Sequence, residues 1–366
     1  MSKETTDNQE KPVVPPKKAD FQGQQLDIFR SFLCNGEEER EQLSNTFDLW
    51  DSVPRYAISR QQMDKIRKTK GFLDLHQIEF HYRGTALKAI IQAARIWDEK
   101  TNTSKDYYPS ANEELIEDAL RKIAAEQRNA FFDKQDYRSG VVFSLHMLRE
   151  ELKKRGHSRS YQQIVLGLNI LASSIIEIRS MDGKNGEGFT KSGYFSGLAA
   201  VSKNKLTEDP QAKWIVQFHP LVTQAIDTLT YRQFNYAQMM GHQTQLARWL
   251  HKQLSLKFTF ASLTNSFEMR YSTIKRDSAL LSNYTRERKA IETLDAAWNE
   301  LTTSGVLMKV EKSEIRGNRN KLEDVVYTIN ASFDFITKMK AANKRQSVTI
   351  SPLAPVDNSA SNVKRR

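Results

Sequence analysis

The sequence predicts a helix-rich α+β protein in which two units of one plan stand between flexible N- and C-terminal tails. Helical patterns followed by strand-like pairs recur in the same order, and both ends of the chain are polar. A chain of 366 residues, 39% of them hydrophobic, is long enough for two or three domains. We expect an arm at 1–44, domains at 45–230 and 231–340, and a basic disordered tail at 341–366.

The first unit begins with three segments of helical pattern, at 112–127, 145–156 and 158–174. In the first of them Leu115, Ala119 and Ile123 share one face, which predicts an amphipathic helix. A β-branched strand is expected at 174–180, and 194–201 is expected to return as its partner after a glycine-rich loop.

The segment before these helices is less regular. Residues 72–84 alternate between apolar and polar side chains, which predicts a strand. Residues 85–99 resemble a packed helix. We assign both segments to the first domain.

The second unit repeats the order of elements. It carries helical patterns at 242–258, 271–281 and 283–303, then strand patterns at 305–313 and 323–329 around a polar loop. Helix, helix, turn, helix, strand, loop, strand is the winged-helix plan, a helix-turn-helix with a β-hairpin attached. The halves share no convincing residue identity, so the repeat is inferred from the order of elements alone.

The helix at 283–303 gathers cations at its entrance and apolar residues along its body. Ile291, Leu294, Trp298 and Leu301 share one face, which must pack on the domain. Cations at a helix start oppose the helix dipole, and an ordinary amphipathic surface helix, the alternative, would more often carry acids there. In a helix-turn-helix this end meets the major groove, where arginine pairs with guanine. We therefore predict DNA contacts from Tyr284, Thr285, Arg286, Arg288 and Lys289, and from Arg316, Arg319 and Lys321 in the hairpin loop.

The first unit carries a milder version of this pattern. Its second helix begins with Arg159, Tyr161, Gln162 and Gln163, and its glycine-rich loop contains Lys184 and Lys191. Glutamine can pair with adenine, but it is also a common surface residue. We include these residues among the candidate DNA contacts, and whether they reach bases or only the backbone stays open.

Composition favours a polyanionic partner. The net charge is +11, which points to nucleic acid before an anionic membrane, although a merely soluble basic protein is the alternative. Cys34 is the one cysteine, so the chain has no internal disulfide, which fits a reducing cytoplasm. We find neither an apolar run long enough to span a bilayer nor a signal peptide, and we expect a cytoplasmic protein.

The segments YYPSANEELIEDALRKIA, YQQIVLGLNILASSIIEI, HQTQLARWLHKQL and RDSALLSNYTRERKAIETLDAAWNELTTSGVL together resemble bacterial plasmid replication initiators of the RepA/TrfA kind. The resemblance covers roughly residues 45–335. It implies a tandem winged-helix protein that binds repeated sites in double-stranded DNA at a plasmid origin. It also implies opening of nearby AT-rich DNA, recruitment of the host initiator ATPase and helicase, copy control, and a monomer–homodimer equilibrium. By this resemblance, the cations at 286–289 belong to the groove-reading helix.

A short peptide in the arm points the same way. QLDIF, formed by Gln25, Leu26, Asp27, Ile28 and Phe29, resembles the peptide that inserts into the bacterial sliding clamp, with isoleucine in place of leucine. A flexible segment of this kind can place its apolar side chains in a pocket of the clamp. A chance match, or packing on its own domain, is the alternative.

Signatures of catalysis are lacking in the sequence. It contains no nucleotide-binding P-loop and no histidine pair of a rolling-circle nicking enzyme. His146 and Arg149 fit a recombinase element, but neighbouring leucines explain that helix as packing. One cysteine and scattered histidines provide no zinc site. We expect no catalytic residues, no metal and no cofactor. The alternatives to an initiator are a transcriptional repressor, which would use the same motifs, and a DNA nicking or strand-transfer enzyme.

Overall fold

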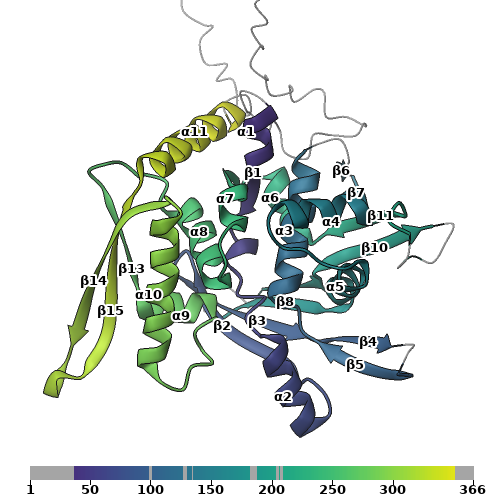
Figure 1. The fold of residues 1–366 in the computed structure, drawn as a ribbon, viewed down its shortest axis with the longest axis horizontal. Coiled ribbons are helices and arrows are strands. Elements are labelled where there is room, and N and C mark those ends of the chain that lie inside the picture. Colours follow the sequence, from purple (N-terminus) through teal and green to yellow (C-terminus); the bar gives the residue numbers. More distant parts are fainter. Residues whose placement is uncertain are drawn as a thin grey trace, which may run out of the picture.

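Two groups of helices and strands follow one another along the chain (Figure 1). Each group is built around its own buried hydrophobic cluster. The structure, a computed structural model, describes residues 37–98, 101–126, 130–133, 135–181, 188–202, 206 and 209–350. The first cluster draws on residues from Leu43 to Met240 and on Ala279, and the second on residues from Leu246 to Ala342. The cores therefore divide after Met240, whereas the sequence placed the domain boundary after residue 230.

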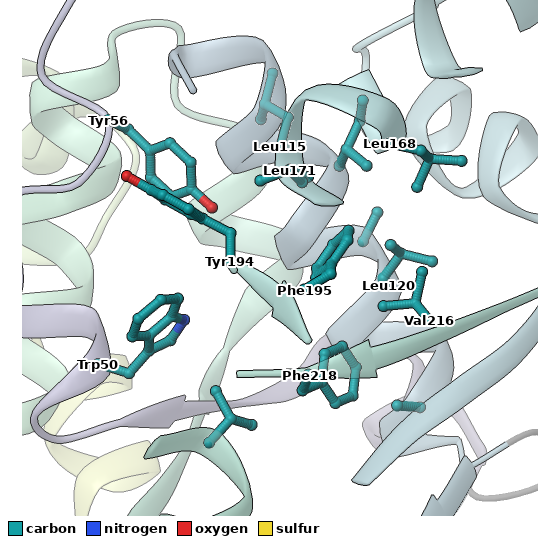
Figure 2. Packing of buried hydrophobic residues seen from close by; sticks show 14 of the residues in the cluster. Trp50, Tyr56, Leu115, Leu120, Leu168, Leu171, Tyr194, Phe195, Val216 and Phe218 are labelled. Carbon is teal, nitrogen blue, oxygen red and sulfur yellow. The ribbon is translucent and has the colours of Figure 1, made fainter. Parts of the chain in front are cut away.

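The first cluster contains a winged helix. Its helices and hairpin strands are α3 (Ala111–Ala125), α4 (Leu145–Lys154), α5 (Tyr161–Ser173), β8 (Ile175–Ser180) and β9 (Phe189–Gly193). Helix α3 packs on both α4 and α5, and Leu115, Leu120, Leu168 and Leu171 meet between them (Figure 2). The expected helices are therefore present, each within a few residues of its predicted ends.

The hairpin of this unit belongs to a wider sheet. Strands β2 (His76–Tyr82), β3 (Thr85–Gln92), β8 and β9 form it in that order, and β4 (Ala94–Asp98) pairs with β5 (Thr103–Tyr107) beside it. The prediction of a packed helix at 85–99 is therefore wrong. Arg83 and Gly84 adopt φ values of 49° and 83°, which turn the chain back on β2 as a two-residue hairpin. Pairing with β8, far away in sequence, then completes the strand.

A second sheet lies against the other side of the first core. Its strands run in the order β10 (Phe195–Val201), β11 (Lys213–Phe218), β7 (Arg138–Ser144) and β6 (Ala130–Asp133). Residues 194–201 were expected to return along 174–180. Instead β9 pairs with β8, and β10 pairs with β11, because the chain crosses between the sheets after Gly193. Phe195, Val216 and Phe218 face the core from this sheet (Figure 2).

Shorter elements complete the first unit. They are α1 (Glu37–Gln42), β1 (Leu43–Phe47), η2 (Trp50–Ser52), α2 (Arg60–Lys70), α6 (Pro220–Asp227), β12 (Tyr231–Asn235) and α7 (Tyr236–Met240). Strand β1 pairs antiparallel with β12, and both Leu43 and Ser44 are buried. The end of the segment predicted as an arm, residues 37–44, is thus part of the folded unit.

The second cluster contains the second winged helix. Its elements are α8 (Gln245–Lys257), β13 (Ser266–Arg270), α9 (Tyr271–Ser278), α10 (Glu287–Thr303), β14 (Leu307–Arg316), η3 (Asn318–Asn320) and β15 (Leu322–Ala331). The sheet order is β13–β15–β14, so β13, the strand that precedes α9, pairs directly with a strand of the hairpin. Ile291, Leu294, Trp298 and Leu301 are all buried, as their spacing predicts. The fold is thus α+β with two winged helices.

A C-terminal helix ties the second unit back to the first. Helix α11 (Phe333–Ile350) packs on β12, where Arg232 donates to Gln346 Oε1 at 2.9 Å and also to Asn343. Ala342 is buried. Residues 341–350, predicted as part of a disordered tail, are therefore helical, because this stretch has a surface to pack on.

Buried charges also join the units. Lys252 Nζ on α8 lies 3.1 Å from Glu114 Oε1 and 2.6 Å from Asp118 Oδ2 on α3. Burial by itself would lower the pKa of Lys252, but attraction to the two carboxylates outweighs it and the pKa is raised. Further ion pairs extend this network in the first unit, among Asp51, Arg55, Glu117 and Arg121. Since an unpaired buried charge is costly, the network favours one seating of α8 on α3.

Candidate nucleic-acid interface

The entrance to α10 is open and cationic. Every residue from Ser282 to Lys289 is exposed, and the side chains of Arg288 and Lys289 are 90% and 66% accessible. Both cations contact one carboxylate, Glu292, at 3.2 Å and 2.8 Å. Such exposed pairs contribute little to stability and exchange readily for another anion. The cations therefore face solvent rather than protein, as a DNA-contacting surface requires.

The first turn of α10 also leaves backbone donors available. Arg286 is its N-cap residue, and within the described part of the chain no side chain caps this end. The backbone N–H groups of Lys289 and Ala290 both bond to the Arg286 carbonyl, which leaves those of the preceding helical residues without a helical acceptor. Free N–H groups and the helix dipole together favour an anion such as phosphate at this end.

The turn between α9 and α10 is held in place from both units. Lys275 on α9 binds Glu287 at 2.9 Å, and this hydrogen bond lowers the pKa of Glu287. Asp277 accepts a 3.0 Å hydrogen bond from the backbone N–H of His81 in β2. Ala279 ends α9 with φ of 54°, and its side chain packs into the first cluster. The first unit thus supports the helix-turn-helix of the second.

The β14–β15 hairpin extends in the direction of the α10 entrance. Strand β14 starts just after α10 ends and runs back along it, so that Lys312 reaches Asp295 at 2.6 Å. Tyr327 on β15 donates to the same carboxylate at 2.7 Å. The hairpin tip therefore lies beyond the middle of α10 and on its N-terminal side. Figure 1 shows the tip and the α9–α10 turn at the lower side of the molecule.

The three predicted hairpin cations differ in their surroundings. Arg316 pairs with Glu314 and donates to the carbonyl of Asn320 at 3.0 Å. Arg319 and Lys321 are exposed, and among the described residues neither side chain has a partner. Arg319 and Asn320 adopt φ of 59°, a left-handed turn that closes the tip. Two free cations therefore stand at the end of the hairpin.

The entrance to α5, in the first unit, is built differently. Ser160 caps the helix, and its backbone N–H donates to Gln163 Oε1 at 3.0 Å in a capping box. Arg159 donates to Asn112 at 2.6 Å. Tyr161 is half-buried, with the Arg149 guanidinium 4.8 Å from its ring centre. Gln162 is exposed, and its side chain has no partner within the described ranges. Most of these polar groups are thus engaged within the protein.

The remaining predicted residues lie mostly outside what the structure describes. Lys191 on β9 is described and pairs with Glu177 on β8 at 3.4 Å. Lys184, which falls between β8 and β9 in the sequence, lies outside the described residues, as does the clamp-like peptide 25–29. Where these residues sit relative to DNA stays a prediction.

Helix α2 is a basic element that the sequence reading did not identify. Ser59 and Gln62 form a capping box at its start, and Gly71 ends it with φ of 80°. A serine three residues before a glutamine, and a glycine after the last helical residue, are the signals that would have revealed it. The helix lies next to the α9–α10 turn (Figure 1).

The described residues contain neither a clustered metal site nor a membrane-spanning helix. Their histidine, cysteine, aspartate and glutamate side chains form no group of three or more that is placed to hold a metal ion. None of the helices in the described ranges has both the length and the hydropathy to cross a bilayer.

Comparison with known proteins yields distant structural neighbours only. No protein-family model and no curated protein matches the chain. A selenomethionine derivative of domains 2 and 3 of RctB matches with a TM-score of 0.45 and 12% identity, over 72% of this chain and 92% of that one. Another crystal structure of RctB domains 2–3 matches with 0.44 and 11%, over 74% and 95%. The Pi initiator protein in complex with iteron DNA matches with 0.34 and 11%, over 81% and 99%.

Proposed function

We propose that the protein is a replication initiator that binds repeated sites in double-stranded origin DNA, with sequence specificity and without covalent chemistry. One observation carries this proposal. The entrance of α10 presents exposed cations and uncapped backbone donors. Beside it stands a hairpin whose tip carries two cations without a partner among the described residues. A reading helix needs such an entrance, and a hairpin placed beside it can reach the backbone or the minor groove.

The cations of the α10 entrance and of the hairpin tip would make two kinds of contact, to bases and to phosphates. Arg286 and Arg288 are the candidates for base contacts, because a guanidinium can bind the two acceptors of a guanine edge. Lys289, Arg319 and Lys321 are the candidates for phosphate contacts, which position the protein without reading sequence. The net charge of +11 strengthens this attraction at long range.

The first unit supplies a second, weaker contact. If α5 and α10 both enter major grooves, the two units span neighbouring turns of the duplex, about 10 bp apart. Because the buried charges around Lys252 connect α3 to α8, the spacing between the units would be set by the protein rather than by the DNA.

Origin opening and partner recruitment belong to the same proposal. The peptide 25–29 would capture the sliding clamp, and the host initiator ATPase and helicase would follow. Monomers would occupy the repeats, and a homodimer would repress replication or the protein's own gene. The resemblance to plasmid initiators supports these roles. A repressor would use the same α10 surface but prefer an inverted repeat over a promoter.

Binding to the DNA that flanks the gene tests the proposal. We expect a footprint on direct repeats of about two helical turns, ~20 bp, next to an AT-rich segment. Arg286→Ala with Arg288→Ala should weaken specific binding by about 1–3 kcal/mol for each arginine that reads a base, and should leave weak non-specific binding. The fold should not change, because both side chains are exposed.

A charge-matched control separates base reading from general attraction. Lys340→Ala with Lys344→Ala removes two exposed cations from α11, at the other end of the molecule. This variant should keep the footprint. A footprint that survives the arginine substitutions unchanged, or protection of a promoter inverted repeat alone, would reject the proposal.

A further inference from the structure

Helix α2 carries more positive charge than its packing uses. Its eleven residues include five cations and one acid. Three of the cations have partners: Arg60 binds Glu113 at 2.6 Å, Arg67 binds Asp64, and Lys70 binds Asp74. Lys65 and Lys68 are exposed, and no described residue pairs with either side chain.

The two unpaired lysines share the outer face of the helix. Met63 is fully buried and Ile66 packs against the first core, which fixes the inner face. Lys65 and Lys68 are three residues apart, so they lie one above the other on the opposite side, where Gln61 is also exposed. Their charges therefore point together into solvent.

The helix is held rigidly. Its start has a capping box, and Gly71 closes its end. The guanidinium groups of Arg60 and Arg67 lie 4.7 Å and 5.1 Å from the ring centre of Tyr107 on β5. The backbone positions of both lysines are therefore set before a ligand binds, and only their side chains need to be ordered.

A helix dipole does not account for both lysines. Cations in the last turn of a helix stabilise it, which explains Lys70 and in part Lys68. Lys65 lies in the middle of the helix, where the dipole has little effect. The nearest acid in the helix, Asp64, is occupied by Arg67 and lies 3.6 Å from Lys105. Nothing within the described residues neutralises the outer face.

The position of α2 indicates the partner. A cavity of about 370 Å³ separates the helix from the α9–α10 turn, with Gln62 and Ile66 on one wall and Ser282 and Asn283 on the other. The basic helix thus stands next to the entrance of α10, at the lower side of the molecule in Figure 1. DNA bound at that entrance would continue past α2.

We propose that Lys65 and Lys68 bind the phosphate backbone of the DNA beside the site that α10 reads. The inference rests on the proposed function and adds a contact that lies outside both helix-turn-helix units. Such contacts carry no sequence information, but they fix the register of the protein on the duplex. The first unit would then hold the backbone with α2 while supporting the reading helix through β2.

The salt dependence of binding tests this contact. Each phosphate contact contributes about 0.9 to the slope of log K against log salt concentration. Lys65→Ala with Lys68→Ala should therefore reduce the slope by about 2, and should weaken binding at 0.15 M salt by roughly 10- to 30-fold. The preference for the origin repeat over unrelated DNA should persist, because phosphate contacts weaken all sequences alike. Lys65→Arg with Lys68→Arg should keep the wild-type slope.

Matched variants make the outcomes distinct. Lys340→Ala with Lys344→Ala removes the same charge from α11, on the far side of the molecule, and should leave the slope of log K against log salt concentration unchanged. An equal reduction of the slope in this variant would attribute the effect to net charge and overturn the inference. A wild-type slope in the α2 variant, with specific binding intact, would overturn the inference and leave the proposed function standing. If the wild-type protein showed no specific binding, both would fall. Unchanged thermal unfolding of each variant confirms that the fold is retained.

Discussion

The two winged helices of this protein begin their second helices in opposite ways. Helix α5 is closed at its start by Ser160 and Gln163, whereas α10 begins at Arg286 without a side-chain cap in the described structure. The cations of α10 face solvent, while Arg159, which precedes the cap of α5, is bound to Asn112. One architecture therefore serves different tasks: a closed entrance stabilises its own helix, and an open one leaves donors for a ligand.

The surrounding sheets show the same contrast. In the second unit β13 joins the hairpin directly, so the unit is a small sheet with its hairpin extended. In the first unit the hairpin is extended on one side by β3 and then β2. The backbone N–H of His81 in β2 binds Asp277, near the start of the second unit's turn. We interpret the first unit as a supporting frame and the second as the unit that reads the DNA sequence.

The largest expected effect tests whether the two units share one frame. Lys252→Ala should lower the free energy of unfolding by about 3–5 kcal/mol, because Glu114 and Asp118 would remain buried without their cation. Urea unfolding followed by tryptophan fluorescence measures this change. Lys340→Ala, an exposed lysine, serves as the control and should change stability by less than about 0.5 kcal/mol. A loss below about 1 kcal/mol for Lys252→Ala would mean that the units are joined by other contacts, and the frame interpretation would fail.

Local patterns predicted the helices, but not how their polar faces meet. The apolar spacing of α10 and of α3 correctly indicated which side chains are buried. The patterns of α3 and α8 gave no sign that Glu114, Asp118 and Lys252 would be buried too. A sequence pattern cannot tell a polar face that meets solvent from one that meets another polar face. Only the tertiary structure brings α3 and α8 together.

Strands were harder to predict for a related reason. Residues 85–92 have a composition that suits a helix, and only the hairpin at Arg83 and Gly84 and the pairing of Ile91 with Ile176 make them a strand. That pairing joins residues far apart in sequence, so no local window contains it. Helix α2, by contrast, carries a capping box at its start and a glycine after its last residue, and both signals can be found in the sequence.

A smaller effect tests the closed entrance of α5. Gln163→Ala removes the acceptor for the backbone N–H of Ser160 and should destabilise the protein by about 0.5–1 kcal/mol. Gln162→Ala is the matched control, because its exposed side chain has no partner among described residues, and it should not change stability. Thermal unfolding measures both. Equal stability of the two variants would remove the contrast between the entrances of α5 and α10. A changed base preference of the Gln163→Ala variant would instead assign Gln163 to reading DNA bases.

An effect of similar size, on DNA binding rather than on stability, compares the two hairpins. Lys321 is exposed without a partner in the described structure, whereas Lys191 is neutralised by Glu177 at 3.4 Å. Lys321→Ala should therefore reduce the slope of log K against log salt by about 0.9, or about fivefold in affinity at 0.15 M salt, as expected for one phosphate contact. Lys191→Ala should leave the slope close to that of the wild type. If instead both substitutions lowered it equally, Lys191 would exchange its carboxylate for phosphate on binding, and the first hairpin would hold DNA as firmly as the second.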